Sequence, residues 1–217
     1  MPRTSAKRLS LRAACIAVAA FTTVAVTAGV AWAAYTDNMY PTQYLTVGCF
    51  SVSGPHQSGF CQTDNSDLTY YMDSGGSNKL EAGDRSVVNN VMNNIYEPTD
   101  LSVTYDSTPS FSGSAETDIV FEESSSGLSS SVDGYTFCNN AATTLKCDQQ
   151  YIRIRGGGHY GQGLVCHETG HAVGLTHGDD ASPRKSRTDE KLGCMETPVS
   201  NDEELQANNI ENINATY

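Results

Sequence analysis

Three histidines and a glutamate stand at a regular spacing between residues 166 and 177. His167 and His171 are four residues apart, Glu168 lies between them, and His177 follows six residues after His171. On an α-helix, residues four apart lie one turn apart on the same side, so both imidazoles can meet one ion. Imidazole nitrogens are common metal ligands, and the spacing therefore predicts a metal site on a helix.

Two residues of this segment indicate a catalytic metal site rather than a structural one. Glu168 lies about 100° around the helix from His167, beside the ion, where it can take a proton from metal-bound water. Gly174 can adopt the positive φ that ends a helix, which lets the chain turn back and deliver His177 as a third ligand. Three protein ligands leave a fourth position for water, which is typical of catalytic zinc.

The full pattern is hard to obtain by chance in a chain of this composition. With five histidines in 217 residues, a chance His-Glu-x-x-His occurs in roughly one such chain in 200. Requiring Gly174 and His177 as well lowers this to about one in 10⁵. The metal site is therefore favoured over histidines that cap or line an ordinary core helix.

The motif His-Glu-x-x-His-x-x-Gly-x-x-His followed by a methionine turn resembles the metzincin zinc endopeptidases, in particular small secreted bacterial matrixin-like or snapalysin-like members. The resemblance implies that His167, His171 and His177 bind one catalytic Zn²⁺. It implies that Glu168 is the catalytic general base, which activates water and later protonates the leaving amine. It also implies that Met195 lies beneath the zinc.

A fold follows from the same resemblance, which covers the chain from about Asp67 to its last residue. The implied fold is an α+β, metzincin-like zincin fold with a mixed, mostly parallel twisted sheet, an active-site helix, a Met-turn and a C-terminal helix. Snapalysins use an aspartate as the third ligand, so Asp179 or Asp180 remains the alternative to His177.

The first 33 residues are typical of a secretory leader. Four cations and no anion precede an Ala/Val-rich run over residues 13–30, and Ala31-Trp32-Ala33 suits cleavage. An uncleaved anchor is the alternative, and it would expose the rest of the chain on the same side. We therefore expect a secreted, extracellular protein with no integral membrane segment once the leader is removed. The predicted parts are a signal peptide (1–33), an N-terminal arm (34–65) and a catalytic domain (66–217).

The cysteine count agrees with export. The chain has seven cysteines, and assigning Cys15 to the leader leaves six, which suits three disulfides in an oxidising compartment. Six cysteines allow fifteen pairings, and we favour the sequential ones. A latent form in which Cys49 binds the zinc is the alternative for that residue. The favoured pairs are Cys49–Cys61, Cys138–Cys147 and Cys166–Cys194, the last of which would tie the metal-site helix to the segment before Met195.

Alternating and helical patterns of apolar residues predict one mixed α+β domain. The segment 82–95 has apolar residues at helical spacing, and Ser200 with Glu203 forms a capping box that predicts the start of a final helix. Residues 34–65 read as irregular and 123–134 as a polar loop. The predicted strands are 67–72, 101–105, 117–121, 135–137 and 151–155, and the predicted helices are 82–95, 162–173 and 200–213.

Other candidate groups carry less weight. Asp179-Asp180 and residues 202–204 could bind Ca²⁺, but neither matches the spacing of an ordered calcium loop, so solvated surface acids are favoured. His159 stands in a glycine-rich loop before the metal-site helix. We expect it on the surface, with a position lining the cleft as the alternative.

The resemblance implies a zinc metalloendopeptidase, a hydrolase that acts as a monomer on protein or peptide substrates lying along residues 135–140. Loss of the four leader cations changes the formal net charge from −12 to −16. The chain has no cluster of Lys and Arg of the kind that binds nucleic acid, and we expect no such partner. The alternatives are a non-catalytic zinc-containing extracellular binding module and a zinc hydrolase of a non-peptide substrate.

Overall fold

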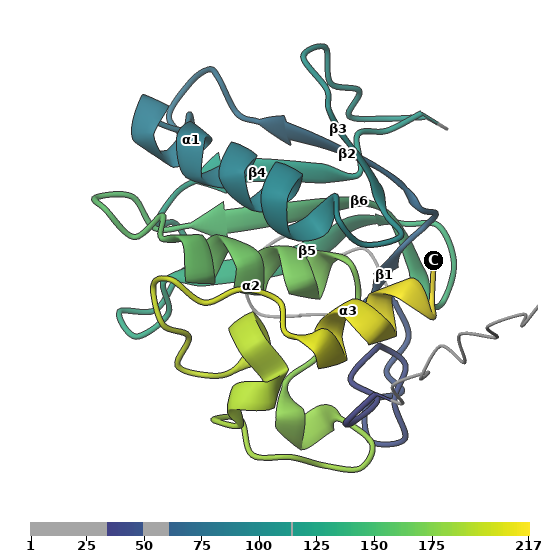
Figure 1. The fold of residues 1–217 in the computed structure, drawn as a ribbon. Coiled ribbons are helices and arrows are strands. Elements are labelled where there is room, and N and C mark those ends of the chain that lie inside the picture. Colours follow the sequence, from purple (N-terminus) through teal and green to yellow (C-terminus); the bar gives the residue numbers. More distant parts are fainter. Residues whose placement is uncertain (1–33, 50–60, 114) are drawn as a thin grey trace, which may run out of the picture. The chain divides into compact units, whose positions relative to one another are not determined.

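The computed structural model describes residues 34–49, 61–113 and 115–217. The predicted signal peptide, with Cys15, lies outside this part of the chain. Figure 1 shows how the helices and strands are arranged. In chain order they are β1 (Gln62–Thr63), β2 (Asp67–Met72), α1 (Ala82–Val91), the π-helical turn η1 (Met92–Tyr96), β3 (Ser102–Tyr105), β4 (Ile119–Glu123), β5 (Gly134–Ala141), β6 (Lys146–Ile154), α2 (Gln162–Ala172), the 3₁₀ turns η2 (Gly178–Asp180) and η3 (Glu190–Met195), and α3 (Ala207–Asn214).

The strands form one sheet in the order β1-β6-β4-β2-β3, with β5 also paired to β6. The β1–β6, β6–β4, β4–β2 and β2–β3 pairs are parallel, and only the β5–β6 pair is antiparallel. The fold is therefore α+β with a mostly parallel sheet, as the sequence predicts. The antiparallel strand β5 lies next to α2, the helix that carries His167 and His171.

The helices α1 and α2 lie side by side over one face of the sheet (Figure 1). Alternate residues of β2, β4 and β6 point to that face, as strand geometry requires. From β2 these are Leu68, Tyr70 and Met72, and they pack in one apolar core with Val88 and Val91 of α1. One side of α2 thus packs on this core through Val165 and Ala172, and the opposite side of the helix does not face the sheet.

Most predicted elements are present, with shifted ends. The strand 67–72 and the helix 162–173 are confirmed almost residue for residue. The predicted strands 135–137 and 151–155 fall on the longer strands β5 and β6, which pair from Gly134 with Ile154 to Ala141 with Cys147, and β6 ends one residue before 155. The helix predicted over 82–95 continues to Tyr96, but its last turn is π-helical. The Tyr96 hydroxyl donates to the main-chain oxygen of Cys166 at 2.7 Å, so this turn ties α1 to α2.

The predicted start of the final helix is wrong. The Ser200 hydroxyl contacts the Glu203 carboxylate at 3.3 Å instead of capping a helix, and α3 begins only at Ala207. The capping box is formed by Gln206 and Asn209. Residues 200–206 instead run along the start of α2, where the Gly163 amide donates to the main-chain oxygen of Asn201 at 2.8 Å.

The part of the arm that the structure describes packs onto the rest of the molecule. Asn38 is fully buried, and its side chain donates to the main-chain oxygen of Thr176 at 3.0 Å. It accepts hydrogen bonds from Asn208 at 3.1 Å and Asn212 at 2.7 Å, both on α3. Met39 belongs to the main core. The arm therefore joins the segment after α2 to the last helix, a connection that its composition did not suggest.

All three favoured disulfides are present: Cys49–Cys61, Cys138–Cys147 and Cys166–Cys194. The first two pack together, with Sγ of Cys49 3.7 Å from Sγ of Cys138. The third joins α2 to η3 and connects residues 28 apart in the chain. Disulfides are typical of exported proteins, which is compatible with the predicted secretion.

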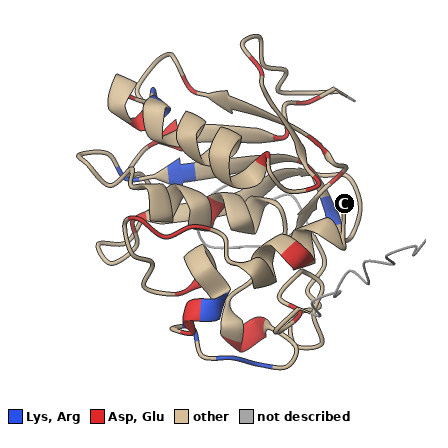
Figure 2. Ribbon diagram, in the orientation of Figure 1, with Lys and Arg blue, Asp and Glu red and all other residues tan. Residues whose placement is uncertain are grey.

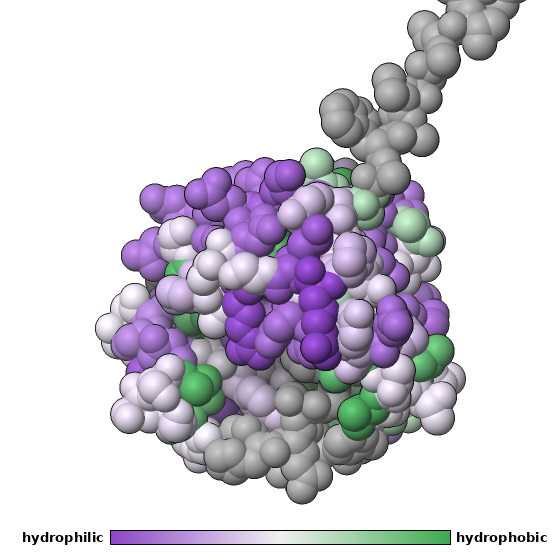
Figure 3. All heavy atoms as spheres, turned by 90° about the horizontal axis from the view of Figure 1, so that it is seen from below, coloured by the Kyte–Doolittle hydropathy of each residue, from purple (hydrophilic) through white to green (hydrophobic). Residues whose placement is uncertain are grey.

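Acidic residues are spread over helices, strands and loops, whereas several basic residues gather in the segment between η2 and η3 (Figure 2). The lower face is mostly hydrophilic, with scattered hydrophobic side chains (Figure 3). Within the described ranges, no helix has the length and apolar character needed to cross a bilayer.

Candidate metal centre

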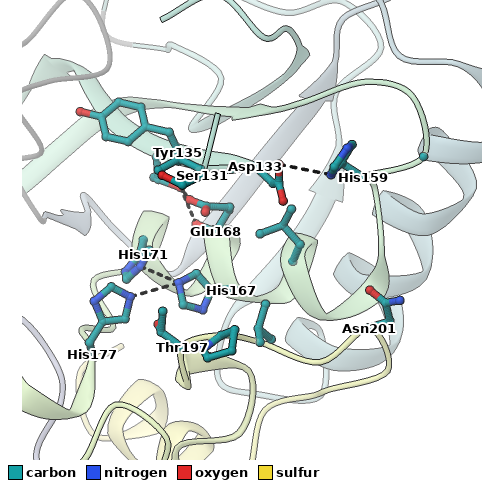
Figure 4. Close-up of a pocket in the computed structure, with 17 residues that line it drawn as sticks. Ser131, Asp133, Tyr135, His159, His167, Glu168, His171, His177, Thr197 and Asn201 are labelled. Atoms are coloured by element: carbon teal, nitrogen blue, oxygen red, sulfur yellow. Dashed lines mark hydrogen bonds and ion pairs between the residues drawn. The ribbon is translucent and has the colours of Figure 1, made fainter. Parts of the chain in front are cut away.

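The three histidines of the motif converge on one point. His167 and His171 extend from consecutive turns of α2, and His177 comes from the segment that follows it (Figure 4). Nε2 of His167 lies 3.1 Å from Nε2 of His171 and 3.1 Å from Nε2 of His177. Nitrogens about 2.0–2.1 Å from a tetrahedral zinc ion are about 3.3–3.4 Å apart, so the spacing suits one such ion.

Main-chain oxygens fix the orientation of the two helical histidines. Nδ1 of His167 lies 2.6 Å from the oxygen of Cys194, and Nδ1 of His171 lies 2.8 Å from the oxygen of Leu175. A carbonyl only accepts, so each Nδ1 carries the proton and each neutral ring has its lone pair at Nε2. This is the tautomer that a metal ligand requires, with the outer nitrogen held by a hydrogen bond.

Burial keeps these rings neutral. It lowers the pKa of His167 to about 4 and that of His171 well below its usual value. Burial and the neighbouring His167 lower the pKa of His177 to about 3. The Nε2 lone pairs of His167 and His171 therefore face each other 3.1 Å apart, an arrangement that repels unless a cation lies between them. The donor set thus fits a metal ion.

Gly174 and the arm deliver the third histidine. Gly174 ends the turn after α2 with a φ of +100°. A Cβ there would lie 2.9 Å from Sδ of Met39 and 3.2 Å from Cα of Gln62, so the arm also leaves no room for a side chain. The next segment is fixed by Asn38, whose main-chain oxygen accepts from the Thr176 amide at 2.8 Å. Asn38 is a positioning residue that the motif alone could not reveal.

The two aspartates considered as alternative third ligands lie close to His177. Carboxylate oxygens of Asp179 and Asp180 lie within 4.8 Å of a ring nitrogen of His177. The Asp179 carboxylate, however, forms an ion pair with Arg187 at 2.8 Å. The geometry favours His177, because its Nε2 is already 3.1 Å from that of His167.

Glu168 lies on the side of the histidines that faces β5. It is only 4% exposed, and its Oε2 accepts a hydrogen bond from the Thr136 hydroxyl at 2.7 Å. Burial raises the pKa of Glu168 to about 7, and the bond from Thr136 opposes that rise. A carboxyl group that titrates near neutral pH in a cleft is suited to accept and return a proton.

Met195 packs directly against α2 at Gly170. Gly170 stands between His167 and His171 on the helix, and a Cβ at this position would overlap Sδ of Met195. Met195 is fully buried, and Cys194 before it is bonded to Cys166. The η3 turn is thereby held against the face of α2 that carries the ligands.

A cleft of about 500 Å³ opens over these groups. Its walls include residues 134–136 of β5 on one side and residues 197–199 on the other, with Leu164 of α2 between them. His159 also lines it and pairs with Asp133, with Nδ1 3.3 Å from Oδ1 (Figure 4). The expected surface position of His159 is confirmed, since its side chain is 41% exposed, and the alternative holds as well because the same ring lines the cleft.

Two other acidic or sulfur clusters do not form metal sites of comparable quality. Cys49, Cys61 and Cys138 lie close together because two disulfides pack there. Glu81, Asp84 and Glu123 form a partly exposed acidic group of a kind that is common without an ion. Residues 202–204, for which Ca²⁺ was the less favoured alternative, form no such grouping among the described residues.

Comparison with known proteins assigns no family to the chain. No protein-family model matches it, and no curated protein does.

Proposed function

We propose that the protein is a secreted zinc-dependent endopeptidase of the metzincin type. The observation that carries the proposal is that Nε2 of His167 lies 3.1 Å from Nε2 of both His171 and His177, beside a buried glutamate in an open cleft. Three neutral nitrogen ligands with a carboxylate next to them are the donor set of a hydrolytic zinc centre. Met195 under the helix supports the metzincin assignment in particular.

A zinc ion held by His167, His171 and His177 would supply a Lewis acid that polarises the scissile carbonyl and lowers the pKa of attacking water toward about 7. Glu168 takes the proton from that water and returns it to the leaving amine. Its buried position beside β5 keeps bulk water from competing for this proton.

The peptide lies along β5 in this proposal. Gly134, Tyr135 and Thr136 line the cleft, so an extended substrate beside them can use main-chain hydrogen bonds of the strand. Leu164 and Val199 add apolar walls for a side chain of the substrate. Recognition through main-chain groups suits a protease that accepts many sequences.

The test compares the full chain, expressed in an exporting host, with its Glu168→Gln variant. We expect both to bind one zinc per chain by metal analysis, and only the unsubstituted protein to digest casein and a peptide library. Glu190→Gln, which changes an exposed carboxylate outside the cleft, is the matched control and should digest normally.

The possible results separate the candidate functions. Zinc binding without hydrolysis of any peptide would favour a non-catalytic binding module. Hydrolysis of an ester or glycan substrate without peptide cleavage would favour a hydrolase of another bond. Unchanged peptide turnover in Glu168→Gln would remove the proposed mechanism.

A further inference from the structure

We propose that Thr136 is a positioning residue that holds the Glu168 carboxylate, and that Gly134 provides the space for it. This inference rests on the proposed function, since it concerns how Glu168 is aimed. Both residues belong to β5 and, being two apart on a strand, point to the same side. That side faces α2, where Glu168 is carried.

The Thr136 hydroxyl contacts Glu168 at two points. Its Oγ1 lies 2.7 Å from Oε2 of the carboxylate and 2.8 Å from the main-chain oxygen of the same residue. The hydroxyl carries one proton and donates to one of these acceptors at a time. Because both acceptors belong to Glu168, either choice keeps Oγ1 next to the carboxylate. Thr136 is 8% exposed, so water competes little for the bond.

Gly134 shapes the other side of the carboxylate. A Cβ at this position would lie 2.6 Å from Oε1, 2.9 Å from Cγ and 3.0 Å from Cδ of Glu168. These separations are too short for any side chain, and the atoms displaced would be those of the carboxylate itself. The absence of a side chain at 134 is therefore a requirement of the observed Glu168 rotamer.

The bond from Thr136 and the space at Gly134 together favour one position of the Glu168 carboxylate. A glutamate side chain has three rotatable bonds, and an unrestrained one must lose that freedom each time it meets the substrate. In this structure part of that freedom is lost on folding, because the Thr136 hydroxyl holds Oε2 and the missing side chain at Gly134 leaves the space that Oε1 occupies. Figure 4 shows Glu168 between the histidines and Tyr135. Tyr135 belongs to β5, the strand beside which the substrate lies in the proposed function. One strand thus aligns the peptide and the base together.

The first experiment removes the hydroxyl but keeps the shape. We expect Thr136→Val to keep one zinc per chain and a KM within about twofold, while kcat falls about 10- to 100-fold because the base is no longer aimed. Thr136→Ser, which keeps the hydroxyl and loses a methyl group, should retain kcat within about threefold. Thr169→Val is the matched control, since this buried hydroxyl on α2 has no hydrogen-bond partner among the described residues. It should leave kcat unchanged.

The second experiment fills the space. Gly134→Ala should lower kcat by a similar factor at unchanged zinc content, since its Cβ displaces the carboxylate. Gly83→Ala on α1 is its control, because nothing lies within 4 Å of a Cβ there. Thermal unfolding of every variant shows whether a loss of kcat reflects unfolding instead.

The outcomes distinguish this inference from the function on which it rests. Wild-type kcat in Thr136→Val, or equal losses in Thr136→Val and Thr136→Ser, overturns the positioning role and leaves the proposed function standing. A folded, zinc-bound, unsubstituted protein that hydrolyses no peptide overturns both. Loss of kcat in Thr136→Val with recovery in Thr136→Ser supports the positioning role.

Discussion

The main-chain oxygen of Cys194 accepts a hydrogen bond from Nδ1 of His167 at 2.6 Å, and the side chain of Cys194 is bonded to Cys166, the residue before that histidine. One residue of η3 therefore holds α2 covalently and accepts the hydrogen bond that orients the adjacent histidine. We therefore expect stability and metal binding to be connected through Cys194.

Removing this bridge should weaken both properties. In Cys166→Ala/Cys194→Ala we expect a loss of about 3–4 kcal/mol of unfolding free energy, from the entropy of a chain no longer closed over 28 residues. We also expect zinc to bind at least tenfold more weakly, since the carbonyl is no longer held against His167. Denaturant unfolding and a competitive chelator titration measure the two effects. Cys49→Ala/Cys61→Ala should lose stability alone, and equal zinc affinity in both double variants would disprove the connection.

Asn38 gives a second test of how the site is held. Asn38→Ala leaves the Asn208 amide and the main-chain oxygen of Thr176 without their buried partner, while the Asn212 amide keeps its bond to the main-chain oxygen of Thr36. Unsatisfied buried polar groups cost about 1–3 kcal/mol each, so the two groups together are expected to cost about 2–6 kcal/mol of unfolding free energy. Because Thr176 precedes His177, zinc affinity should fall as well. Lys79→Ala, on the surface, is the control, and an unaltered zinc affinity in Asn38→Ala would show that His177 is positioned without it.

The close packing of Gly170 and Met195 predicts a compensating pair. Gly170→Ala places a Cβ on Sδ of Met195, and overpacking of this kind costs about 1–3 kcal/mol of unfolding free energy. Met195→Ala leaves a cavity and costs about 2–5 kcal/mol. The double variant should lose less than the sum, because each change relieves the other. Urea unfolding of the four proteins gives the coupling energy, and strict additivity would mean that the two residues do not press on each other.

Acid should remove the metal, and stability should fall with it. Without metal, the pKa of His167 is about 4 and that of His177 about 3, against about 6.5 in an unfolded chain. As the pH falls below about 6.5, the unfolded chain binds protons that the folded one does not, so the unfolding free energy decreases until about pH 3–4. Bound zinc adds to this dependence because it binds only neutral rings. Thermal unfolding and zinc content between pH 8 and pH 4 measure both effects, and full zinc retention at pH 4 would contradict ligation by three histidines.

Asp118 should show the opposite dependence on pH. Burial raises its pKa to about 6, and hydrogen bonds from the Thr69 amide and hydroxyl only partly offset this. The folded state therefore holds this proton more tightly than the unfolded one, and its contribution to the unfolding free energy falls as the pH rises from about 4 through 6. Asp118→Asn should raise stability by about 1–3 kcal/mol at pH 8 and change it little at pH 4. A loss of equal size at both pH values would show that the bonds to Thr69 matter more than burial.

The sequence predicts well the helices and strands whose position is determined by the pattern of residues within the element itself. The 67–72 strand alternates between fully buried and less buried positions, and α2 carries His167 and His171 at helical spacing, so local pattern and final structure agree. The predicted start of the last helix failed because Ser200 and Glu203 bond to each other, while the chain around them follows α2. A capping pattern is local, and here a tertiary contact outweighs it.

The same distinction applies to the site. The ligand histidines and Glu168 were recognisable because they share one short segment. Thr136, Gly134 and Asn38 were not, since each acts from a distant part of the chain: Thr136 is 32 residues from Glu168, and Asn38 is 138 residues from Thr176. Their residue types are ordinary, and only the folded structure gives them partners. No spacing rule connects them to the motif.

Asn38 also determines when the site can form. Its side chain bonds Thr176, next to His177, and at the same time Asn208 and Asn212 on α3. A chain made from its amino terminus cannot complete this junction until residue 212 has left the ribosome. The convergence of the three histidines is therefore among the last features to be assembled, and a half-emerged chain does not present the finished cluster to its neighbours.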